Sequence, residues 1–164
     1  MKKLFTLSLL FVLLACVGVF AQDKQIKFSL SPSIALPQGI ISDLVTVGGT
    51  LEVKGEYPLN EAVNFYGSLG FGLAAYKSNI SGSASFIPAL VGLTYTQNRF
   101  HAGFGVGYVS YKLDRSIDRL GGFSFRPQMG FDITDKFQLN FNYTATSTKE
   151  IDISYIGISP VIKF

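Results

Sequence analysis

The sequence predicts an all-β fold, in which eight antiparallel strands in up-and-down order close into a barrel that spans a membrane, after a cleaved signal peptide. Three observations predict it. Eight segments alternate apolar and polar residues, short and long connections take turns between them, and the last segment ends on the aromatic residue Phe164. Successive strand residues point to opposite faces, so a strand between lipid and a lumen alternates in this way.

The amino end reads as a secretory signal. A short positive region, Met1 to Lys3, precedes an apolar run from Leu4 to Leu14, and Val19-Phe20-Ala21 supplies small residues for a signal peptidase. The apolar stretch is on the short side of the roughly 20 residues that a membrane-spanning helix needs. We expect cleavage after Ala21, with residues 1–21 as the signal and residues 22–164 as one barrel domain.

The single cysteine, Cys16, leaves an alternative open. Leu13-Leu14-Ala15-Cys16 loosely resembles a lipoprotein processing box, in which the cysteine becomes a lipidated amino terminus. The residues that follow Cys16 are apolar, whereas a lipoprotein tether is normally polar, so removal with the signal is favoured. The mature chain then needs neither a disulfide framework nor a metal-thiolate site.

Composition favours a membrane barrel. The whole chain has 14 basic and 11 acidic residues, and Lys2 and Lys3 leave with the signal, so 14 − 2 = 12 basic residues remain against 11 acidic ones. Nucleic-acid binding needs clustered basic residues on one face and loses its electrostatic basis here. The 17 glycines, 15 phenylalanines and 8 tyrosines, with only 15% charged residues, indicate β-structure exposed to apolar surroundings.

The first three strands show plain alternation, one face apolar and the other polar or small. Their apolar faces are Ile26, Phe28, Leu30 and Ile34 in residues 25–36; Val47, Leu51, Val53 and Tyr57 in residues 46–57; and Val63, Phe65, Leu69, Phe71 and Leu73 in residues 62–75. The fourth strand, residues 84–95, is apolar on both faces, which leaves its register undetermined.

The last four strands return to alternation. Their apolar faces are Phe100, Phe104, Val106 and Tyr108 in residues 99–111; Phe123, Phe125, Met129 and Phe131 in residues 122–133; Phe137, Leu139, Phe141 and Tyr143 in residues 136–146; and Ile156, Ile158 and Ile162 in residues 153–164. The seventh strand is the most regular, because Gln138, Asn140, Asn142 and Thr144 occupy its other face. Pro160 departs from the pattern, since it removes a hydrogen-bond donor near the closing seam.

Short and long connections alternate along the chain, and their order predicts how the barrel is oriented in the membrane. Tight turns are expected at residues 58–61, 97–98 and 134–136, and longer segments at 37–45, 76–83, 112–121 and 146–151. Outer-membrane barrels have short periplasmic turns and longer extracellular loops, so this parity puts both termini in the periplasm.

A soluble eight-stranded barrel, such as a lipocalin, is the structural competitor, because alternation alone does not say which face is inside. Three features favour the membrane. The polar face of the seventh strand is uncharged filler for a packed lumen, aromatic residues lie near strand ends as interfacial girdles would, and the chain stops on Phe164.

The signal, the eight alternating segments, the turn parity and the closing IGISPVIKF resemble the small eight-stranded outer-membrane barrels of the OmpA, OmpX and OmpW kind. The resemblance covers the whole mature chain. It implies a Gram-negative cell envelope and insertion by the barrel assembly machinery, for which Ile156, Ile158, Ile162 and Phe164 would be the assembly signal.

The interior of an eight-stranded barrel is just wide enough for side chains to fill, which excludes a general diffusion porin. The charged residues assigned to the lumen are Lys27, Glu52, Lys54, Glu56, His101, Arg126 and Lys163. Buried charges need partners, so a structural network is the first interpretation. The alternative is a narrow gated ion path, in which Glu52 or Glu56 exchanges between Arg126 and Lys54, or a carrier of small hydrophobic molecules.

An enzyme is a distant third hypothesis. The one histidine, His101, is followed by Ala102 and Gly103, so the His-x-Ser spacing of lipid A deacylases is absent. One histidine without a carboxylate cluster does not predict a metal site, and no cofactor is expected.

The exposed charged segment 112–121 gives one candidate surface contact. Arg115 and Arg119 could meet lipopolysaccharide phosphates, although a solvated loop of mixed charge is the simpler interpretation. The sequence thus predicts a monomeric, non-enzymatic outer-membrane barrel with a structural or surface-interaction role, in contact with outer-membrane lipid.

Overall fold

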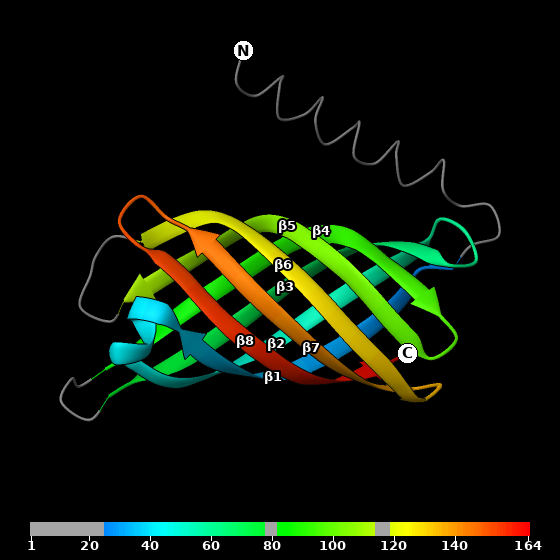
Figure 1. Ribbon diagram of the computed structural model, residues 1–164, viewed down its shortest axis with the longest axis horizontal. Helices are drawn as coiled ribbons and strands as arrows, with labels where there is room; N and C mark the ends of the chain where they lie inside the picture. The colour runs from blue at the N-terminus through cyan, green and yellow to red at the C-terminus, as the bar shows by residue number, and fades with distance from the viewer. Residues whose placement is uncertain (1–24, 78–81, 114–118) are drawn as a thin grey trace, which may run out of the picture.

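The computed structural model describes residues 25–77, 82–113 and 119–164, which form one closed antiparallel barrel in the order β1 to β8 (Figure 1). The strands are β1 (Lys27–Gln38), β2 (Val45–Pro58), β3 (Val63–Tyr76), β4 (Ser83–Gln97), β5 (Phe100–Leu113), β6 (Arg119–Thr134), β7 (Phe137–Ser147) and β8 (Asp152–Lys163). The predicted eight-stranded up-and-down barrel is confirmed, and every strand boundary lies within three residues of the expected one. The expected signal, residues 1–21 with Cys16, lies outside the described residues.

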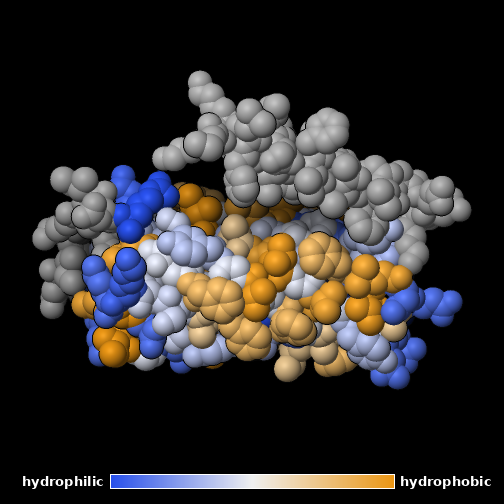
Figure 2. All heavy atoms as spheres, turned by 90° about the horizontal axis from the view of Figure 1, so that it is seen from above, coloured by the Kyte–Doolittle hydropathy of each residue, from blue (hydrophilic) through white to orange (hydrophobic). Residues whose placement is uncertain are grey.

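The two faces of the wall follow the predicted alternation. Phe28, Leu69 and Phe123 point outward and are 54%, 61% and 62% exposed. On β7 the inward residues Gln138, Asn140 and Thr144 are buried. Figure 2 shows apolar side chains over the middle of the wall and polar ones gathered at both ends. The outer surface is therefore an apolar belt, and the polar side chains are enclosed.

The register of β4, which the sequence left undetermined, is set by its neighbours. Phe86 pairs with Gly72 of β3 and Tyr111 of β5, and its side chain is buried in the lumen. Leu90 also points inward and is buried. Both faces of this strand are apolar because its inner face packs against other side chains in the lumen, whereas its outer face belongs to the apolar belt.

Three interruptions of the pairing ladders contain proline. The closing ladder between β1 and β8 joins Leu30 to Ile162 and resumes at Ile34 and Ile158, and the gap holds Pro32 and Pro160. Pro88 lies in the gap between β3 and β4, and Pro127 in that between β6 and β7. Proline has no backbone N–H to donate, so pairing is lost locally while the barrel stays closed.

The connections separate into two ends. The turn end carries residues 59–62, 98–99 and 135–136 together with the carboxyl terminus (Figure 1). Asn98 adopts a positive φ of 56° in its two-residue turn, a conformation that asparagine tolerates. The loop end carries the links 39–44, 77–82, 114–118 and 148–151, and the first includes a 3₁₀ turn, Gly39–Asp43.

Among the described residues, no helix is long and apolar enough to cross a membrane.

Candidate functional site

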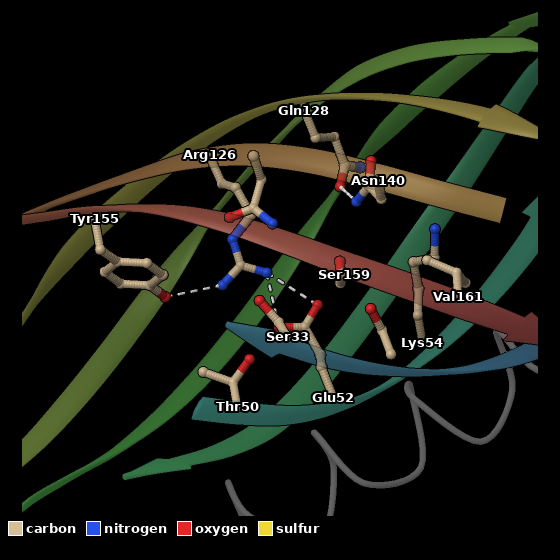
Figure 3. A pocket seen from close by; sticks show the side chains of 12 residues that line it. Ser33, Thr50, Glu52, Lys54, Arg126, Gln128, Asn140, Tyr155, Ser159 and Val161 are labelled. Atoms are coloured by element: carbon tan, nitrogen blue, oxygen red, sulfur yellow. Dashed lines mark hydrogen bonds and ion pairs between the residues drawn. The ribbon is translucent and has the colours of Figure 1, made fainter. Parts of the chain in front are cut away.

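An arginine lies at the centre of the lumen. Arg126 points inward from β6 and is 5% exposed. Its Nη1 donates to both oxygens of Glu52 on β2, at 2.9 and 2.7 Å, and its Nη2 donates to Tyr155 Oη at 3.2 Å (Figure 3). Its Nε donates to Thr144 Oγ1 at 2.8 Å. A buried guanidinium needs a charged partner and further acceptors, and this arrangement supplies both.

Hydroxyl groups extend this centre toward the loop end. Ser124 Oγ lies 2.7 Å from Thr146 Oγ1, which lies 3.1 Å from Tyr111 Oη. We call Glu52, Ser124, Arg126, Thr144, Thr146, Tyr111 and Tyr155 the central network. Its members come from β2, β5, β6, β7 and β8, so it ties opposite walls of the barrel together.

A second charged group lies toward the turn end. Asp132 accepts from Lys163 Nζ at 2.5 Å, and its other oxygen lies 2.8 Å from His101 Nε2. That second contact is an ion pair when the imidazole is protonated. The other ring nitrogen, Nδ1, is 2.9 Å from Thr96 Oγ1. The group therefore fastens β4, β5 and β6 to the closing strand.

Lys54 lies between the two charged regions, since it lines both the cavity beside Arg126 and the cavity beside His101. Its Nζ lies 3.1 Å from Glu56 Oε1 and 5.5 Å from the centre of the Tyr66 ring. The Tyr66 side chain lies over Gly92 and Gly105, where an added methyl group would overlap it. Glycine on the inner face thus makes room for a large neighbour.

Little free space remains at these levels. The cavity beside Arg126 has a volume of about 20 Å³, and the one between Lys54 and His101 about 10 Å³. A water molecule needs roughly 10 to 15 Å³ of such volume, so each holds one or two waters at most.

The structure brings five of the seven residues assigned to the lumen into ion pairs: Glu52, Lys54, Glu56, Arg126 and Lys163. A sixth, His101, contacts the carboxylate of Asp132. Lys27, at the first residue of β1, is exposed and is not among these pairs. Sequence reasoning left Asp132 out of the network, although the alternation of residues 122–133 placed it on the polar face. Its two partners come from other strands, which a pattern within one strand does not reveal.

Other predicted sites lie on the surface. Ile156, Ile158 and Ile162 are on the outer face of β8, and the backbone N–H of Phe164 donates to Phe28 O at 2.9 Å across the closing seam. Their role as an assembly signal stays a prediction. Arg119 is exposed at the loop end of β6, whereas Arg115 lies outside the described residues.

No grouping of three His, Cys, Asp or Glu side chains suited to a metal ion occurs within the described ranges.

A closed eight-stranded barrel with an apolar belt and an enclosed polar core defines an integral β-barrel of the membrane. The family model described as outer membrane protein beta-barrel domain matches residues 7–164, so the chain belongs to that family, whose place is the bacterial outer membrane. The search of curated proteins found no match.

Several solved structures share the fold. The attachment invasion locus protein Ail of Yersinia pestis is 12% identical, with a TM-score of 0.59 over 86% of this chain and 97% of that one. The N-terminal barrel domain of Pseudomonas aeruginosa OprF is 9% identical, with a TM-score of 0.60 over 87% and 100%. Neisserial surface protein A is 11% identical, with a TM-score of 0.56 over 87% and 100%.

Proposed function

We propose that this protein is a non-conducting outer-membrane barrel with a structural role, whose lumen is a plug and whose outer surface makes its contacts in the envelope. The observation that carries the proposal is the pairing of Arg126 with Glu52 across the lumen, with about 20 Å³ of free volume beside it. A hydrated ion needs a continuous wet path, and one or two water positions do not supply it.

A gated channel is the competing function. In that mechanism Glu52 would leave Arg126 for Lys54, but Lys54 Nζ already lies 3.1 Å from Glu56. Exchange would also leave Arg126 with only Thr144 and Tyr155 as neutral partners, and an uncompensated buried charge is costly. The same network blocks passage of a hydrophobic molecule from one end of the lumen to the other.

Planar-bilayer conductance of the refolded protein tests the proposal. A heat-dependent shift on a gel first establishes that the barrel is closed. We expect no discrete conductance steps from wild-type protein that shows the shift, and none from Arg119→Met, which alters only an exposed charge. Discrete steps that change in size with Glu52→Gln would contradict the plug and support the channel.

The outer surface offers a contact for anionic lipid. Lys112 of β5 and Arg119 of β6 are paired in register at the loop end, and both are exposed. Like charges directly opposite each other are unfavourable, and a bound phosphate between them would offset that repulsion. We infer that lipopolysaccharide phosphate binds here; Arg115, the other arginine that the sequence suggested for this contact, lies outside the described residues.

We also infer the finer features of location. In a Gram-negative cell the signal would be removed after Ala21, and the barrel assembly machinery would insert the chain. The inserted protein would be a monomer without enzymatic activity. The turn end, with both termini, would face the periplasm. The two-residue turns at that end support this orientation, although the link 148–151 at the loop end is no longer than 59–62.

A further inference from the structure

The lumen contains a cavity of a different character near the loop end. Its volume is about 100 Å³, several times that of the polar cavities, and carbon atoms form nearly all of its lining. Four aromatic residues line it: Tyr76, Phe86, Tyr111 and Tyr155. Three of their rings are grouped, since the centre of Phe86 lies 5.8 Å from that of Tyr111 and 5.7 Å from that of Tyr155. We call this space the apolar cavity.

The apolar cavity exists because the inner faces of two strands are apolar at this level. β4 contributes Ala84 and Phe86, and β8 contributes Ile153, all of them buried. Small side chains on the neighbouring strands, Ala35 of β1 and Ala74 of β3, leave the space unfilled. The apolar inner face of residues 84–95 is the sequence signal for it.

Tyr155 separates the apolar cavity from the central network. Its ring lines the apolar cavity, while its hydroxyl accepts from Arg126 on the other side. The Tyr111 hydroxyl is likewise bonded to Thr146. The two phenol groups on this floor therefore already have partners within the protein and offer little to a cluster of water molecules.

A dry cavity of this size favours an apolar occupant. Water enters a cavity when it finds two to four polar partners, whereas an apolar cavity of comparable size stays dry and binds benzene. The lining also gives an aromatic ligand edge and face contacts with three rings.

We propose that the apolar cavity is a binding site for a small hydrocarbon of about one aromatic ring, held at the loop end and stopped from going further by Tyr155 and Arg126. This binding function goes beyond the plugged barrel. It also differs from a carrier, because the ligand does not traverse the lumen.

Titration with benzene, followed by methyl NMR of the full barrel in phospholipid nanodiscs, tests the site. Benzene also dissolves in the bilayer, so the measurement compares methyl groups on the two sides of the wall. Ala84 and Ile153 report on the apolar cavity, whereas Ala89 and Ile158 face outward. We expect saturating shifts at the first pair, with a dissociation constant on the order of 1 mM or tighter, and only linear shifts at the second.

Filling the apolar cavity provides the matched variant. Ala84→Phe adds a ring inside it and should weaken benzene binding at least roughly tenfold, whereas Ala89→Phe adds the same ring on the outer face of the same strand and should not. Linear shifts at Ala84 and Ile153, or saturation unchanged by Ala84→Phe in a barrel that still shows the heat shift, would overturn the proposal.

Should Ala84→Phe fail to insert, the wild-type protein decides. Nuclear Overhauser contacts from benzene to the Ala84 and Ile153 methyl groups support the site, and contacts to outward methyl groups alone refute it.

Discussion

Removing the charges of the central pair, singly and together, should show how the lumen is stabilised. Arg126→Met keeps much of the side-chain length and removes the guanidinium that bonds Glu52, Thr144 and Tyr155. The Glu52 carboxylate, 14% exposed, is then left in the lumen without its counter-charge. Glu52→Gln leaves Arg126 as the unpaired charge instead.

The expected magnitudes follow from the burial of the pair. Breaking a buried ion pair by removing one partner costs about 3 to 5 kcal/mol of unfolding free energy. Because Glu52 retains some exposure, we expect about 3 kcal/mol for each single variant. The double variant leaves no unpaired charge and should lose only about 1 to 2 kcal/mol, so the coupling between the two positions is about 4 to 5 kcal/mol.

Urea unfolding in phospholipid vesicles measures these values. The chain has no tryptophan, so far-UV circular dichroism and the heat-shifted fraction on a gel are the signals. Arg119→Met, an exposed change on the same strand, is the control and should stay within about 0.5 kcal/mol of wild type. If the two single losses simply add in the double variant, to within about 0.5 kcal/mol, the pair is not a coupled unit and the reasoning fails.

Two further predictions concern the wall and its surface. Gly92→Ala should lower the yield of folded barrel, because the added methyl group would overlap the Phe104 carbonyl and the Tyr66 ring. Gly67→Ala is the control and should fold as wild type, since its methyl group would meet no atom within 4 Å. Equal heat-shifted fractions for the two variants would contradict this. Replacing Lys112, Arg115 and Arg119 together by alanine should reduce the lipopolysaccharide that co-purifies with the barrel, since phosphate loses its cationic partners; unchanged lipid content would rule out this surface as a lipid site.

Most of the fold was predictable because each strand carries its own evidence. On β7, the run from Phe137 to Thr144 alternates without exception, and burial confirms its inner face. The tight turns were predictable from local sequence as well. β4 was the exception, because a strand that is apolar on both faces fits either register until its neighbours are in place.

The candidate site was predictable in composition but not in pairing. Alternation put Glu52, Arg126 and His101 on the polar face, but it did not say that Arg126 pairs with Glu52 and that Asp132 collects both His101 and Lys163. These partners lie on different strands. Their distances depend on the stagger of the closed barrel, which sequence spacing does not encode.

The sequence by itself determined the eight strands, the two kinds of face and the polar composition of the lumen, because a strand's period of two is a local property. Only the tertiary structure decided which charges meet, how small the space beside Arg126 is, and that Phe86, Tyr111, Tyr155 and Ile153 surround an apolar cavity. The physical reason is closure: joining β1 to β8 fixes the stagger of all the strands at once, and the stagger sets which side chains share a level of the lumen.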